Sequence, residues 1–127
     1  MPKVALWFFA VAPVYVLVGM IVGIVMGATM DFTIAPAHAH LNLIGWVTMA
    51  LYGTFYALAP AAPQKLAWTT FYLNNAAVIV MFPSLAMVLK NGDASPFVIP
   101  LILSEFTAVA ALLCFIASVW SVVLKRS

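Results

Sequence analysis

Four long apolar runs occupy nearly the whole of this 127-residue chain, and they restrict what it can fold into. A helix needs roughly 20 apolar residues to cross the hydrocarbon core of a bilayer. The runs predict helices at about 4–30, 37–58, 66–89 and 97–124. Proline and small polar residues between the runs predict short turns. We therefore expect one domain, an all-α integral membrane four-helix bundle.

The composition supports lipid as the main solvent and partner. Hydrophobic residues make up 67% of the chain and charged residues only 6%, whereas soluble domains carry about a quarter charged residues. The net charge of +2 comes from few basic residues near predicted helix ends, so it does not indicate nucleic-acid binding. Cys114 is the single cysteine, which excludes an intrachain disulfide.

The basic residues of the short loops predict the orientation, because cytoplasmic loops are enriched in Lys and Arg. Lys90 falls on one side of the predicted membrane, together with Asp31 and Asp93. The other side carries four basic residues: Lys3, Lys65, Lys125 and Arg126. We therefore expect a multi-pass protein of the bacterial inner membrane with both termini in the cytoplasm.

A glycine repeat lies on one face of the first predicted helix, at Gly19, Gly23 and Gly27. Small residues at this spacing let another helix backbone approach closely. A flat surface for a cofactor is the alternative reading. We favour helix–helix contact, within one chain or between copies.

Both histidines of the chain, His38 and His40, lie at the start of the second predicted helix. Ionisable side chains in a membrane usually have a partner or a function, and neutral imidazole binds haem iron or copper. Two residues of a regular helix separate these side chains by about 200°, so they cannot both ligate one metal. His38, Asn42 and Gly45 share a face, where Gly45 would leave space for a flat macrocycle. The alternative is that the histidines are interface anchors.

Glu105 is the only acidic residue inside a predicted helix. It lies about 12 Å below the predicted outer end of that helix, at 1.5 Å rise per residue. An intramembrane carboxyl is a candidate functional group. We expect either a proton or hydrogen-bond role near a histidine, or a protonated side chain that bonds across helices.

Residues 38–46, His-Ala-His-Leu-Asn-Leu-Ile-Gly-Trp, resemble helix 2 of subunit I in the haem-copper oxidase superfamily, which includes the nitric oxide reductases. The segment is more similar still to the His-x-His segments of small membrane haem proteins related to that family. The resemblance implies haem b with His40 as axial ligand and His38 as the next choice. It also implies cofactor contacts at Asn42, Gly45 and Trp46.

The chain departs from that family in length and in later histidines. No histidine follows His40, whereas the family's second axial ligand and copper ligands come from later helices. We therefore expect an electron carrier or a binder of O2 or NO rather than a complete oxidase. A second axial ligand would come from another copy of the chain, which implies a homo-oligomer, or from Met30 or Met87. Five-coordinate haem is a further alternative.

Two other function classes remain open from the residues alone. In the first, His38 and His40 bind copper or zinc in a membrane metal protein. In the second, the chain is an accessory or assembly subunit of a respiratory complex and has no cofactor of its own. A redox partner is expected only if the haem reading holds.

Overall fold

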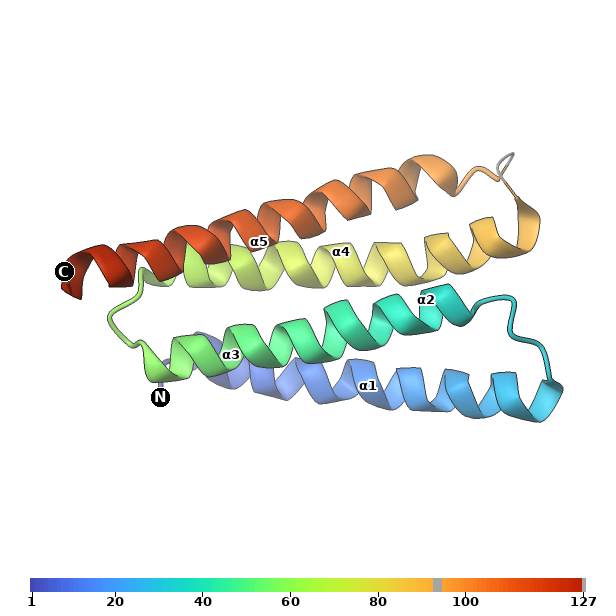
Figure 1. Cartoon of the computed structure of the whole chain (residues 1–127), viewed down its shortest axis with the longest axis horizontal. Coiled ribbons are helices and arrows are strands. Elements are labelled where there is room, and N and C mark those ends of the chain that lie inside the picture. The colour runs from blue at the N-terminus through green and yellow to red at the C-terminus, as the bar shows by residue number, and fades with distance from the viewer. Residues whose placement is uncertain (93–94, 127) are drawn as a thin grey trace.

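The computed structural model describes residues 1–92 and 95–126, and this part of the chain forms a helical bundle without strands (Figure 1). Its elements are α1 (Lys3–Thr29), α2 (Ala35–His40), η1 (Leu41–Thr48), α3 (Met49–Leu58), α4 (Gln64–Asn91) and α5 (Val98–Arg126). Because α2, η1 and α3 follow one another directly, they form one long helix. Within the described residues, four helices are long and apolar enough to cross a membrane.

The predicted all-helical fold is confirmed, and each helix end lies within two residues of its predicted position. Local sequence explains the ends. Pro36 lies in the first turn of α2, where its missing N–H costs nothing. Gly92 follows α4 with φ 78°, a conformation that glycine adopts without strain. Asp93, predicted in this turn, lies outside the described residues.

Both ends of the chain lie at the same end of the bundle, as four successive crossings require (Figure 1). The main aromatic core lies in that half. Phe8 of α1 stacks on Tyr56 of α3 at a ring-centroid distance of 5.8 Å and meets Phe71 of α4 edge-on at 5.2 Å. The Tyr56 hydroxyl lies 2.8 Å from Ser118 Oγ, so this core is also hydrogen-bonded to α5.

Glycines set how closely α1 approaches the second long helix. A Cβ at Gly53 would lie 2.7 Å from Phe8 Cβ, and a Cβ at Gly19 would overlap the side-chain amide of Asn42. At Gly23 a Cβ would meet the His38 ring, whereas at Gly27 it would have open space. The predicted helix–helix contact is thus confirmed at Gly19 and Gly23 but not at Gly27.

Candidate functional site

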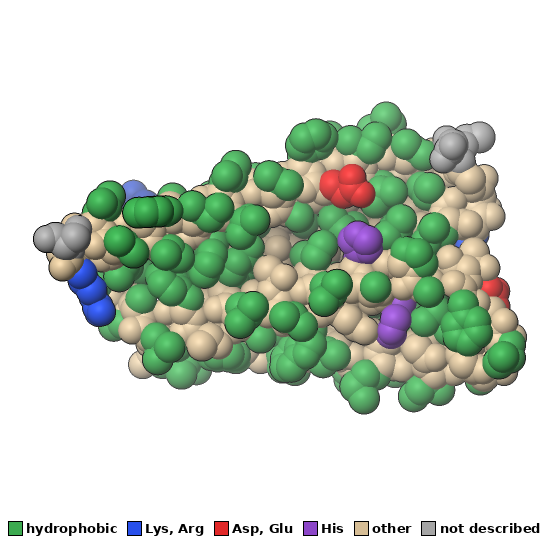
Figure 2. All heavy atoms as spheres, viewed as in Figure 1, with side chains coloured by type: hydrophobic (Ala, Val, Ile, Leu, Met, Phe, Trp, Pro, Cys, Tyr) green, Lys and Arg blue, Asp and Glu red, His purple; other side chains and the backbone are tan. Residues whose placement is uncertain are grey.

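The two histidines of α2 have different surroundings. The His38 ring faces α1, where its Cε1 would lie 3.2 Å from a Cβ at Gly23. His40 is half-buried, and its Nδ1 lies 2.7 Å from the carbonyl oxygen of Pro36 at the exposed surface. Figure 2 shows the histidine side chains as two separate purple patches on one face. That the two histidines cannot both ligate one metal stays a prediction.

The hydrogen bond of His40 determines which ring nitrogen is free. A carbonyl oxygen only accepts hydrogen bonds, so Nδ1 of His40 carries the proton and donates it to Pro36. In the neutral ring, Nε2 then keeps its lone pair. Histidines that ligate metals commonly donate their second N–H to a backbone carbonyl in this way. The ring of His40 is therefore oriented and in the tautomer that a metal requires.

His38 is engaged inside the bundle instead. The Asn42 amide Nδ2 donates to His38 Nε2 over 3.3 Å, which uses the lone pair that a metal would need. Within the described residues, His38 Nδ1 and Asn42 Oδ1 are buried without a hydrogen-bond partner. Unpaired buried polar atoms are costly, yet both side chains are held tightly between α1 and the second long helix.

Gly45 and Trp46 contact the protein core. The side chain of Tyr15 fills the space beside Gly45, where a Cβ would lie 2.9 Å from Tyr15 Cβ and Cγ. Trp46 packs, half-buried, against the main apolar core. The space that we expected Gly45 to leave for a macrocycle is thus taken by a tyrosine. Cofactor contacts at Gly45, Trp46 and Asn42 stay predictions.

Sequence reasoning missed that the segment after His40 is a π-helix, Leu41–Thr48. Its hydrogen bonds run over five residues instead of four, and such segments often occur at functional sites. Asn74 of α4 is almost fully buried and donates from Nδ2 to the Ile44 carbonyl oxygen over 3.1 Å. The signal that was available is an asparagine in the middle of an apolar helix, which needs an interhelical partner.

A groove of about 270 Å³ runs along the π-helix between the second long helix and α5. Its walls are formed by seven residues, Ile44, Thr48, Tyr52, Asn74, Ala108, Val109 and Leu112. His40 precedes Ile44 by four residues, and Glu105 precedes Val109 by the same interval. The second long helix and α5 both begin at the end of the bundle opposite the termini. His40 and Glu105 therefore precede the groove at the same end.

Glu105 lies exposed on the surface of α5. Figure 2 shows an acidic side chain over α5 on the same face as the histidine rings, and Glu105 is the only acidic residue of that helix. A carboxyl group at this depth is costly when it faces lipid.

Within residues 1–92 and 95–126, no group of three or more His, Cys, Asp or Glu side chains is placed to hold a metal ion. An axial position on haem needs only one histidine from each side, since the macrocycle supplies the other ligands.

Comparison with protein-family models, with curated proteins and with solved structures finds no match for this chain. The similarity of residues 38–46 to oxidase helix 2 therefore remains a resemblance of one segment.

Proposed function

We propose that the protein binds haem b through Nε2 of His40 and serves in electron transfer or in binding a diatomic gas. The observation that supports this most directly is the 2.7 Å contact between His40 Nδ1 and the Pro36 carbonyl oxygen. This contact leaves Nε2 as the ligating atom and fixes the ring plane. When bound, the haem iron supplies the redox change or the gas-binding position.

The groove beside the π-helix suits one edge of such a group. Its walls are mainly apolar, and Thr48 and Asn74 add polar groups. A volume of about 270 Å³ lies just below the usual range of roughly 300–1,000 Å³ for pockets that enclose ligands. One chain would thus cover one side of the macrocycle, and a second copy would cover the other.

We further propose a homo-oligomer in which a second copy contributes its own His40. A two-fold interface repeats the same residues on both sides, so it would offer two histidines to one iron. Glu105 lies exposed on α5, and in this arrangement it would leave the lipid and become available for hydrogen bonding. Bis-histidine haem favours electron transfer, whereas a single His40 ligand leaves a position for O2 or NO.

The proposed location is the inner membrane of a bacterium, with both termini in the cytoplasm. Four of the five basic residues lie near the chain ends or at the start of α4, on the same side of the bundle as the termini. Cytoplasmic segments are enriched in Lys and Arg. His40 would then lie near the outer face. A redox partner would approach from that side.

A haem titration tests the proposal. Detergent-purified protein without haem is titrated with haemin, and the Soret band is recorded for wild type, His40→Ala and His38→Ala. We expect saturable binding that His40→Ala weakens by more than about tenfold, while His38→Ala retains the spectrum. A wild type that binds no haem would overturn the proposal. Binding of copper or zinc by that colourless protein would favour the metal-protein alternative.

A further inference from the structure

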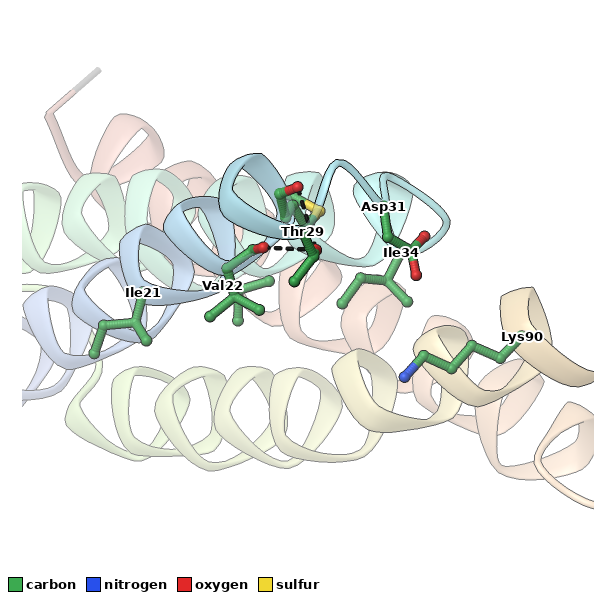
Figure 3. A pocket seen from close by; sticks show the side chains of 8 residues that line it. Ile21, Val22, Thr29, Asp31, Ile34 and Lys90 are labelled. Carbon is green, nitrogen blue, oxygen red and sulfur yellow. Dashed lines mark hydrogen bonds between the residues drawn. The ribbon is translucent and has the colours of Figure 1, made fainter.

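A second cavity lies at the opposite end of the bundle from the termini, between α1, the α1–α2 loop and α4 (Figure 3). Its volume is about 330 Å³, within the range of ligand sites. Five apolar side chains form most of its lining: Ile21, Val22, Val25, Met26 and Ile34. Met26 is only 7% exposed, whereas Ile21 and Val25 are more than half exposed. The cavity therefore has a buried floor and a side that is open to the surroundings of the bundle.

Three polar side chains stand at one end of this apolar cavity. Thr29 and Asp31 come from the end of α1 and the following loop, and Lys90 comes from the end of α4. In Figure 3 the Lys90 side chain extends from α4 toward the α1–α2 loop, and the Asp31 carboxylate lies next to Ile34 in that loop. The Lys90 ammonium and the Asp31 carboxylate thus both lie at this polar end of the cavity.

The Asp31 carboxylate is held ionised and in place. The Thr33 hydroxyl donates to Asp31 Oδ1 over 2.6 Å, and the Thr33 amide donates over 3.1 Å. These bonds, together with the positive charge of Lys90, lower the pKa of Asp31. Thr29, the last residue of α1, and Lys90, one residue before the end of α4, both line the cavity. Helix C-termini carry partial negative charge and favour a cation nearby.

We propose that this cavity binds one zwitterionic phospholipid that carries a primary amine in its headgroup. An acyl chain lies along the apolar lining, the phosphate meets the Lys90 ammonium, and the headgroup ammonium meets the Asp31 carboxylate. The cavity thus offers one cation and one anion beside an apolar surface, and such a lipid carries the complementary charges and chains. The three donors of an ammonium group also suit a carboxylate and the free carbonyls of a helix end.

The test uses native mass spectrometry of the detergent-purified full chain, with three lipids of identical acyl chains. Phosphatidylethanolamine has the amine, phosphatidylcholine has a bulky methylated amine without N–H donors, and phosphatidylglycerol has the phosphate alone. We expect phosphatidylethanolamine to bind about fivefold more tightly than either of the others, because phosphatidylglycerol lacks the ammonium and phosphatidylcholine lacks its N–H donors. Equal binding of all three lipids would overturn the proposal, because lipid at the bundle surface would then be non-specific.

Two variants separate the charges. Asp31→Asn keeps an oxygen that accepts from Thr33 but removes the charge, so the preference over phosphatidylglycerol should disappear. Lys90→Gln should weaken binding of all three lipids by a similar factor, and Lys65→Gln at the other end of the bundle should change nothing. Circular dichroism verifies that each variant is folded. An unchanged lipid preference in folded Asp31→Asn would contradict the proposal, and a misfolded variant would leave the wild-type comparison to decide.

Discussion

The His38 ring packs onto Gly23 of α1, and a Cβ at position 23 would lie 3.2 Å from His38 Cε1. Four residues earlier, Gly19 receives the amide of Asn42 in the same way. The glycine repeat of α1 thus accommodates the polar side chains that precede and begin the π-helix. It receives the His38 ring, whereas the Nδ1 of His40 bonds to the Pro36 carbonyl oxygen of its own helix.

The loss of stability on replacing each of these glycines by alanine should follow how closely its neighbours approach it. Gly19→Ala would overlap Asn42 and should destabilise the bundle by about 2 kcal/mol, the usual cost of forcing extra atoms into a packed site. Gly23→Ala should cost less, because the His38 ring needs to move only slightly. Gly27→Ala is the matched control, and the better helix propensity of alanine should make it neutral or stabilising by up to about 1 kcal/mol. Unfolding in SDS, followed by circular dichroism, measures the order, and equal stability of all three variants would contradict these contacts.

Asn74 should stabilise the π-helix through its bond to the Ile44 carbonyl oxygen. Asn74→Leu keeps a similar volume and removes the donor, so we expect a loss of about 1 kcal/mol, as for other interhelical hydrogen bonds in membranes. Hydrogen exchange of the backbone amides in 41–48 should accelerate more than exchange in α5. If exchange in 41–48 is unchanged, Asn74 does not stabilise this segment.

The bond between Tyr56 and Ser118 should couple α3 to α5. Ser118 Oγ donates to the Cys114 carbonyl oxygen over 3.1 Å, so the Tyr56 hydroxyl is the donor toward Ser118. A double-mutant cycle with Tyr56→Phe and Ser118→Ala should give a coupling energy of about 1 kcal/mol. Tyr72→Phe is a control, since Tyr72 is 63% exposed and should tolerate the change. Additive effects of the two substitutions would show that the hydroxyls do not interact.

Asp31 should make stability depend on acidity. Its hydrogen bonds from Thr33, with a smaller effect of Lys90, lower its pKa below the ordinary value of 3.8. A carboxyl with a lowered folded-state pKa adds stability above its unfolded pKa and loses it as the pH falls through the folded pKa. The melting temperature of the wild type should therefore fall toward that of Asp31→Asn below about pH 4. A constant difference between the melting temperatures of wild type and Asp31→Asn from pH 6 to pH 3 would contradict this role of Asp31.

Sequence patterns predicted the helices because length and hydropathy alone decide which segments can span a bilayer. The face formed by His38, Asn42 and Gly45 was also predictable, since all three contact α1. The π-helix was not predicted; the Ile44 carbonyl oxygen within it accepts a hydrogen bond from Asn74, which lies on another helix.

The position of Tyr15 beside Gly45 was equally hidden, since a glycine admits either a cofactor or a neighbouring side chain. Likewise, the Pro36 carbonyl that orients His40 is a backbone group, and no side-chain pattern reveals it. The preference for His40 over His38 came from the resemblance of one segment, and the structure adds the hydrogen-bond partners of each ring.

Imidazole rescue tests whether Nε2 of His40 ligates haem iron. Reduced and oxidised visible spectra are recorded for haem-loaded wild type, His38→Ala, and His40→Gly with and without imidazole. We expect sharp reduced α and β bands in wild type and His38→Ala, their loss in His40→Gly, and their return when imidazole fills the vacated position. Bands that persist in His40→Gly, or that disappear only in His38→Ala, would contradict it.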